Sequence, residues 1–245
     1  FDPKLKEKNE FILNDIKEII CGYDGDSFSF DNERPESKVY VDPFILSEFV
    51  TNEDWLSFMD DDGYDRPEFW LSDGWEFVKK NKINKPMYWI DNNNLFSLNG
   101  VEKIKMNSPV SHISFYEAMA FSHYKKKKVP TEFELECVLK ESGKSGNLLE
   151  ENYFKEHSYN SDKFVKSFYG NLWTWSSSPY LPFKNYNPYK ESLSEYNGKF
   201  MCNQYVLKGG SFATPKNHIR ASYRNFYYPN DRWQFVGLRL SESLN

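Results

Sequence analysis

The chain has few cysteines and no long apolar run. Its three cysteines are too widely spaced for a zinc-binding pattern or a disulfide framework, so we expect a reducing, cytoplasmic compartment. They are Cys21, Cys137 and Cys202. No stretch has the length and hydrophobicity of a membrane-spanning helix, and the opening residues show no secretory pattern of charged and apolar segments. We therefore expect neither a disulfide-stapled secreted domain nor a membrane protein.

An excess of basic charge is also missing. Lys and Arg number 31 against 36 Asp and Glu, which gives a formal net charge of -5. Because a phosphate backbone attracts basic surfaces, we expect no nucleic-acid partner. The one basic cluster, residues 125–128, is interpreted as a solvated turn between two helices, with an anion-binding patch as the alternative.

Patterns of metal ligands and nucleophiles are scarce as well. The four histidines include no pair at the spacing of a metal site, so each is interpreted as a hydrogen-bonded structural residue. They are His112, His123, His157 and His218. Neither a nucleophile elbow nor a phosphate-binding glycine loop is present. The residues alone therefore indicate no catalytic group and no metal ligand.

Aromatic side chains are abundant: the chain has 21 Phe, 17 Tyr and 7 Trp, which make up 18% of its residues. Rings at this density suit a broad, loop-rich core, because one ring covers much irregular backbone. With 39% hydrophobic and 27% charged residues, the composition is that of a globular protein. After Gly143, short apolar pieces separated by Gly, Pro, Asn and Ser predict short strands joined by long loops.

Four helices and one strand are predicted before that point. Apolar residues near helical spacing predict an amphipathic helix over residues 4–20, ending before Gly22. Capping boxes that begin at Thr51, Ser114 and Thr131 predict helices over residues 51–59, 114–124 and 131–140. Alternation of apolar and polar residues predicts a strand over residues 38–44.

Four segments are specific enough to compare with a known family. They are residues 109–118 (PVSHISFYEA), 128–136 (KVPTEFELE), 170–180 (GNLWTWSSSPY) and 206–212 (VLKGGSF). In this order they resemble the formylglycine-generating-enzyme, or sulfatase-modifying-factor, family. The resemblance implies an α+β, C-type-lectin-like fold with little regular structure and many ordered loops.

A narrower resemblance covers nearly the whole chain. Residues 30–33 (FDNE), 70–75 (WLSDGW), 195–204 (EYNGKFMCNQ) and 223–226 (YRNF) are similar to segments of the bacterial ergothioneine sulfoxide synthases. Members of that group join a thiol to the trimethylated histidine hercynine, using oxygen and a non-haem iron. The resemblance implies that three histidines of an N-terminal four-helix domain would hold the iron, two of them on its last helix.

The chain departs from both groups where the chemistry would lie. In the register of the resemblance, Lys4 and Lys8 stand at the two histidine positions of that last helix, and an ammonium group has no lone pair for a metal. Residues 211–240 contain no cysteine, whereas the generating enzymes carry a copper-binding pair there. Thr174 replaces an acid in a loop that can hold calcium in relatives, and calcium prefers charged oxygen ligands. We therefore expect no iron cofactor and no catalysis by this chain alone.

The resemblance also implies that the loop within residues 220–239 faces a substrate pocket. Guanidinium groups suit carboxylates and aromatic rings suit a trimethylammonium group, so the expected ligand is a small zwitterionic amino acid or betaine. The alternative is that the arginines stack on rings to brace the core, which Arg224 favours because it lies in a fold motif. The candidate ligand-binding residues are Arg220, Arg224, Tyr227, Tyr228 and Arg232.

Two domains and three functions follow as hypotheses. Residues 1–22 would be the remnant helix of the helical iron-binding domain, and residues 23–245 the lectin-like domain. The chain would be a non-catalytic binding or assembly subunit, half of a split sulfoxide synthase whose partner chain supplies the helical domain and iron, or an independent recognition module for ligands or proteins. Fold alone does not choose among them.

Overall fold

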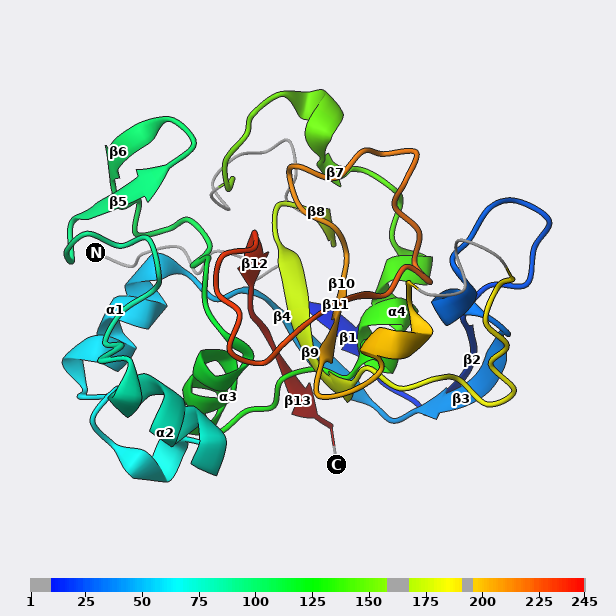
Figure 1. The fold of residues 1–245 in the computed structure, drawn as a ribbon, viewed down its shortest axis with the longest axis horizontal. Helices are drawn as coiled ribbons and strands as arrows, with labels where there is room; N and C mark the ends of the chain where they lie inside the picture. The colour runs from blue at the N-terminus through cyan, green and yellow to red at the C-terminus, as the bar shows by residue number, and fades with distance from the viewer. Residues whose placement is uncertain (1–9, 158–167, 191–195, 245) are drawn as a thin grey trace.

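The structure is a computed structural model that describes residues 10–157, 168–190 and 196–244. A three-stranded antiparallel sheet lies at its centre, in the order β1-β4-β13 (Figure 1). Its strands are β1 (Phe11–Leu13), β4 (Phe44–Phe49) and β13 (Arg239–Ser243). The first and the last described strands therefore flank the same central strand.

A four-stranded sheet has the order β11-β10-β9-β12. Its strands are β9 (Trp173–Pro179), β10 (Tyr205–Lys208), β11 (Asn225–Tyr227) and β12 (Val236–Gly237). The pairs β9/β10 and β10/β11 are antiparallel, whereas β12 runs parallel to β9. These short strands match the interrupted apolar pieces of the sequence after Gly143.

Three further pairs of strands complete the described sheets, of which β2–β3 and β5–β6 lie at opposite sides of the molecule (Figure 1). They are β2 (Lys17–Cys21) with β3 (Ser37–Val41), β5 (Asn94–Ser97) with β6 (Gly100–Lys103), and β7 (Gly146–Asn147) with β8 (Tyr169–Gly170). Among the described residues, short 3-10 helices are η1 (Asp31–Glu33), η2 (Pro67–Phe69), η3 (Leu149–Glu151) and η5 (Gly198–Phe200).

The capping boxes predict three of the α-helices, and the structure confirms them. The helices are α1 (Asn52–Asp60), α2 (Ser72–Lys80), α3 (Phe115–Tyr124) and α4 (Glu132–Glu141). In α1, α3 and α4 the cap hydroxyl accepts the third helical amide, and the carboxylate of that residue accepts the cap amide. Helix α2 has Leu71 at its N-cap with no side-chain cap, which explains why this signal misses it.

The helix predicted over residues 4–20 is wrong for residues 10–20, and residues 4–9 lie outside the described part of the chain. Residues 11–13 pair with β4 and residues 17–21 pair with β3. Ile19 is buried, whereas Ile12 and Ile16 are 51% and 65% exposed. These residues form strands because pairing with β4 and β3 satisfies their backbone hydrogen bonds. Alternate side chains of a strand point to opposite faces, so only some of the apolar residues that suggested a helix are buried.

Gly22 also has another role than ending a helix. It follows β2 with φ +88°, and a Cβ added there would lie 2.7 Å from the carbonyl oxygen of Glu33. Its amide donates to a carboxylate oxygen of Glu136, 2.7 Å away. Glycine is therefore required by a positive φ and by close backbone approach.

Aromatic side chains fill the largest core cluster, as their number predicts. Trp55 is fully buried and stacks on Phe121 with ring centres 4.9 Å apart. Trp175 is also fully buried, and its indole N–H donates to the carbonyl of Ile113 at 3.0 Å. Such buried rings are stable when their polar atoms find partners.

Candidate functional site

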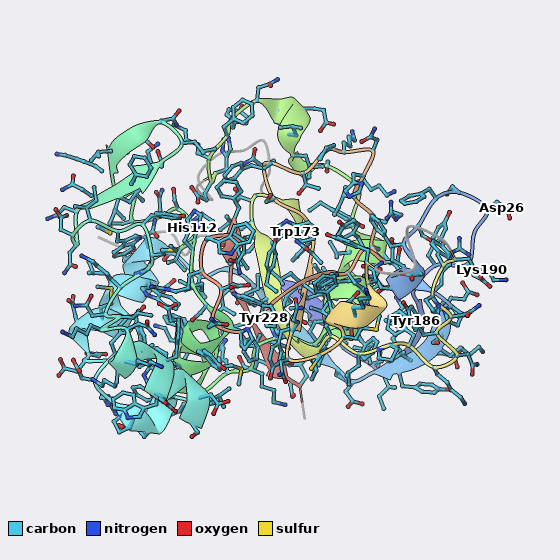
Figure 2. All side chains as sticks on the ribbon, in the orientation of Figure 1. Asp26, His112, Trp173, Tyr186, Lys190 and Tyr228 are labelled. Carbon is cyan, nitrogen blue, oxygen red and sulfur yellow. The ribbon has the colours of Figure 1, made fainter. Side chains whose placement is uncertain are left out.

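A cavity of about 520 Å³ lies beside β11 and η5, and we call it the aromatic cavity. Seven rings line it: Phe30, Tyr196, Phe200, Tyr223, Phe226, Tyr227 and Tyr228. Its polar lining residues are Asn32, Asn197, Gln204, Arg224, Asn225 and Asp231. Figure 2 shows Tyr228 near the middle of the molecule. A concave site with many rings and a few converging polar groups is the usual form of a small-molecule site.

Local pairing positions these rings. Phe226 in β11 pairs with Val206 of β10 and stacks on Tyr180 with ring centres 4.1 Å apart. The amide of Tyr228 donates to Asp231 Oδ2 at 3.2 Å, and the Asp231 amide donates to the Tyr228 carbonyl at 3.0 Å. This turn returns the chain and places Asp231 at the wall.

Two polar atoms of the lining residues are buried without a hydrogen-bond partner in the described structure. They are the Asn32 Oδ1 acceptor and the Gln204 Nε2 donor. The other end of the Asn32 amide is well bonded, donating to the Tyr180 hydroxyl at 2.8 Å. Because buried polar groups normally have partners, these two atoms are candidates for contact with a bound molecule.

Arg224, a predicted ligand-binding residue, lines the cavity but is paired within the chain. Its Nε and Nη2 donate to the two carboxylate oxygens of Glu132 at 2.8 and 3.0 Å. Nη1 donates to the carbonyl of Asn32, and Nη2 also donates to that of Leu181. Both charged partners are nearly fully buried. Arg224 is thus engaged by an internal carboxylate, and its ligand-binding role stays a prediction.

Arg220 is paired in the same way with Glu33. Its Nη2 and Nε donate to the carboxylate at 2.6 and 3.0 Å, and Ser222 donates a third bond at 2.6 Å. Burial opposes ionisation of Glu33, but the bonds from Arg220 and Ser222 outweigh it and hold the pKa of Glu33 below its ordinary value. The Arg220 fork is therefore engaged by an internal carboxylate.

Arg232 completes the pattern through Glu117. Its Nε and Nη2 donate to the carboxylate of Glu117 at 2.8 and 2.9 Å, and Nη2 also contacts the carbonyl of Lys85. Burial lowers the pKa of Arg232, but the Glu117 charge more than compensates and raises it. Neither Arg232 nor Arg220 is among the residues that line the aromatic cavity, whereas Arg224, Tyr227 and Tyr228 are. A ligand-binding role for Arg220 and Arg232 stays a prediction.

Three glutamates that pair with these arginines were not predicted from the sequence. Glu117 had a signal, since it closes the capping box of α3, and Glu132 begins α4. Glu33 lies in the segment FDNE, and its side chain also accepts the amide of Phe30 at 2.8 Å. Their partners lie 92 to 187 residues away along the chain, so spacing alone does not reveal the pairs.

The electrostatics of the aromatic cavity favour a cation. Arg224 is the one Lys or Arg among the described lining residues, and Glu132 neutralises it. Asp231 supplies a carboxyl group, and burial raises its pKa although the Tyr228 amide partly offsets this. Burial also raises the pKa of Tyr227, which stays a neutral phenol at physiological pH. A positive ligand would find rings, a carboxyl group and no uncompensated cation.

Metal ligands do not cluster in the described part of the chain: no group of three or more His, Cys, Asp or Glu side chains there is arranged to hold a metal ion. Lys4 and Lys8 lie outside the described residues. Among the described residues, no helix combines the length and hydrophobicity needed to cross a bilayer. The described residues thus offer no donor set that fits the iron of the sulfoxide synthases.

The histidines make structural contacts. His123 Nδ1 lies 2.6 Å from the carbonyl of Phe69, and His218 Nε2 lies 3.2 Å from the Tyr223 hydroxyl. The His112 ring packs edge-on against Tyr88, with ring centres 4.5 Å apart. The contacts of His123 and His218 agree with the interpretation of hydrogen-bonded structural residues, whereas His112 Nδ1 has no hydrogen-bond partner in the described structure.

We expect His112 to titrate well below a free histidine. Burial lowers the pKa of His112 from 6.5 to about 4, and hydrogen bonding to the Trp233 backbone offsets only part of this. The unfolded chain then binds more protons between these pH values, so this contribution to stability is complete above about pH 6.5 and is lost as the pH falls towards 4. The slope is at most about 1.4 kcal/mol per pH unit.

Proton NMR titration of the imidazole measures this pKa directly. The His112→Asn variant, whose side chain tolerates the φ of +60°, should show a flatter dependence of unfolding free energy on pH in that window. A His112 pKa at or above 6 would contradict the expectation.

Comparison with known proteins agrees with this architecture. The profile of the sulfatase-modifying factor enzyme 1-like domain matches residues 18–167 and 158–244, and the chain belongs to this family. The structure of PvdO from Pseudomonas aeruginosa superposes with a TM-score of 0.60 at 14% identity, over 96% of this chain and 94% of that one. Treponema denticola variable protein 1 gives 0.60 at 15% identity, over 96% and 99%. The predicted α+β, formylglycine-generating-enzyme-type fold is thus confirmed.

Curated relatives point to one branch of the family. Hercynine oxygenase of Mycolicibacterium smegmatis is 28% identical over 255 residues, covering 91% of this chain and 59% of the relative. Hercynine oxygenase of Mycobacterium tuberculosis is 29% identical over 240 residues, covering 87% and 56%. The chain therefore spans less than two thirds of the length of these relatives. The resemblance to the sulfoxide-synthase group is confirmed as distant homology over most of the chain.

Proposed function

We propose that this chain is a small-molecule-binding domain whose aromatic cavity takes a zwitterionic amino-acid derivative or betaine by its cationic group, and that it does not catalyse a reaction alone. The observation that carries the proposal is the composition of the cavity wall. Seven rings and the carboxyl group of Asp231 surround a volume of about 520 Å³. A quaternary ammonium group is weakly hydrated and is recognised by ring faces.

The other end of such a ligand also has a complement. The Gln204 Nε2 donor is buried and without a partner in the described structure, so it can donate to a ligand carboxylate. The guanidinium groups of the three arginines are already paired with Glu33, Glu117 and Glu132. The Gln204 amide would therefore bind the ligand carboxylate in their place. The carboxylate is thus held less strongly than by a free arginine, and the cationic end contributes more to recognition.

We expect binding in the micromolar to millimolar range, because a few such contacts leave little free energy after the loss of ligand freedom. Calorimetry with hercynine, ergothioneine and cysteine tests this. Tyr228→Ala removes one ring at the mouth and should weaken binding of hercynine by about 0.5–2 kcal/mol, roughly 2- to 30-fold. Asp231→Asn should weaken it as well and should remove the loss of affinity that accompanies protonation of Asp231 at low pH.

Tyr40→Ala is the matched control, because Tyr40 is 69% exposed on β3 and is not a lining residue of this cavity. Its affinity for hercynine should equal that of the wild type. Arg220→Ala and Arg232→Ala report on the predicted role of the two forks in holding the carboxylate. No heat with any of the three compounds at millimolar concentration, or equal affinity of wild type and Tyr228→Ala, would contradict the proposal.

A second candidate function is half of a split sulfoxide synthase. The aligned length favours it, since the chain covers 56–59% of the length of each of three proteins named hercynine oxygenase. We expect the purified chain to bind no stoichiometric iron, because Lys4 and Lys8 stand at the implied ligand positions. Elemental analysis after anaerobic iron loading measures this.

Affinity purification from the native cells separates the two candidates. Recovery of a second chain with a histidine-rich helical bundle, and sulfoxide formation by the pair, would support the split enzyme. One iron per isolated chain would show that the register of the lysines is wrong.

A further inference from the structure

A second cavity, which we call the hairpin cavity, lies between the β5–β6 hairpin, residues 111–112, residues 154–156 and the segment that enters β12. Its volume is about 190 Å³. It shares no lining residue with the aromatic cavity. The two cavities can therefore be tested independently by substitution.

The wall of the hairpin cavity is mostly apolar. Tyr88, Trp89, Phe96, Phe212, Trp233 and Phe235 supply rings. Phe96 and Trp233 are 57% and 55% exposed, so apolar surface continues from the cavity into solvent. Since an engineered apolar cavity of about 150 Å³ binds benzene, the observed volume suits one ring or two small fused rings.

One polar group in this wall is held rigidly. The His112 amide donates to the carbonyl of Val236 at 3.1 Å, and its carbonyl accepts the amide of Met87 at 3.1 Å. The ring packs edge-on against Tyr88 and Phe235, with centres 4.5 and 5.4 Å away. Figure 2 shows His112 beside the strand region that contains β12. The imidazole therefore has little freedom to seek another partner.

His112 also carries an unused acceptor. Its Nδ1 is buried and has no hydrogen-bond partner in the described structure. Burial keeps the imidazole neutral at physiological pH. In the tautomer with its proton on Nε2, Nδ1 presents the lone pair and accepts a proton donor. The conformation at φ +60° is rare for a residue with a side chain, and the two backbone bonds maintain it.

Charged ligands fit this wall poorly. A cation or anion would lose its hydration among rings, and His112 is neutral. The charged residues of the wall are Lys155 and the half-buried Glu156. Desolvation raises the pKa of Glu156, although a hydrogen bond with the Ser111 side chain and the charge of Lys155 oppose this. The acid is thus already in contact with the chain.

We propose that the hairpin cavity binds a flat, uncharged heteroaromatic molecule of one or two rings, which stacks among the rings of the wall and donates one N–H hydrogen bond to His112 Nδ1. Shape and apolar contact give most of the affinity, and the single acceptor selects molecules with a donor in the ring. This site is separate from the proposed cation site.

Indole and benzofuran are the probes, since benzofuran keeps the shape and replaces the N–H by an oxygen. Tryptophan fluorescence of Trp89 and Trp233 is confounded by indole, so calorimetry or ligand-observed NMR is used. We expect wild type to bind indole about five- to tenfold more tightly than benzofuran. His112→Gly, which accepts the positive φ, should bind both equally. Phe96→Ala, at the exposed rim, should weaken both by a similar factor.

Tyr228→Ala is the control and should bind indole as the wild type does, because Tyr228 lines the other cavity. Equal affinity of the wild type for indole and benzofuran would overturn the donor assignment. No binding of either probe at millimolar concentration would overturn the site itself. Loss of indole binding in Tyr228→Ala, with full binding in Phe96→Ala, would place the probe in the aromatic cavity and also overturn the site.

Discussion

Replacing Glu117 with leucine is expected to lower the free energy of unfolding by about 3–5 kcal/mol. The Glu117 side chain is fully buried and accepts from Arg232 twice, from the Tyr64 hydroxyl at 2.6 Å, and from the amide and hydroxyl of Ser114 at 2.8 Å. Leucine removes both acceptor oxygens and the five hydrogen bonds they accept, and it leaves the Arg232 charge buried without its partner. Removal of one member of a buried pair is among the most destabilising single changes.

Urea denaturation followed by circular dichroism measures the effect. Glu76→Leu is the control, because Glu76 is exposed on α2 and should change stability by less than about 0.5 kcal/mol. If Glu117→Leu were within 1 kcal/mol of wild type, the carboxylate would not connect α3 to the 232 segment as the structure shows. The loss should be larger than that of Thr51→Ala, which removes only a cap worth about 1 kcal/mol.

Lys208→Met is expected to cost about 3–5 kcal/mol as well. Lys208 is fully buried in β10, and its Nζ lies 3.0 Å from Glu136 Oε2 in α4, which is 1% exposed. Methionine fills similar space but leaves the Glu136 carboxylate with the amide of Gly22 and the half-exposed Lys140 as its remaining partners. A buried carboxylate with fewer partners is strongly destabilising.

A second substitution distinguishes charge from packing. Lys208→Met combined with Glu136→Gln removes both charges and retains an oxygen acceptor for the Gly22 amide. We expect the double variant to recover at least about 1–2 kcal/mol relative to Lys208→Met, since a neutral pair has a smaller desolvation cost. Strict additivity of the two single effects in this cycle would contradict a direct interaction.

Local signals in the sequence predict the elements whose cause is local. The boxes at Thr51, Ser114 and Thr131 fix three helix starts because both halves of each box lie within four residues. The helix prediction for residues 10–20 is wrong because these residues pair with β4 and β3, which lie elsewhere in the chain. Their apolar spacing is compatible with two periods, and only the pairing chooses one.

The candidate site likewise has a part that the sequence predicts and a part that depends on tertiary contacts. The sequence indicates that residues 220–233 carry arginines and rings, and the structure brings Tyr227, Tyr228 and Arg224 to one cavity. The sequence does not indicate that Glu33 and Glu117 accept hydrogen bonds from the guanidinium groups of Arg220 and Arg232. Those contacts join segments far apart in the chain. Charge compensation of this kind depends on tertiary structure, so residue type alone overestimates the number of guanidinium groups available to a ligand.

The position of β13 beside β4 has a consequence for biosynthesis. Arg239 is in register with Phe49, and the three-stranded sheet is incomplete until residues near 243 are available. Contacts this distant in sequence raise the contact order, and closing a loop of that length must precede the contacts that compensate for it. During translation the central strand β4 therefore waits, with one edge unpaired, while almost two hundred further residues are made. The nascent chain should depend on protection from aggregation for that interval, and this sheet should be completed only after residues 239–243 have been synthesised.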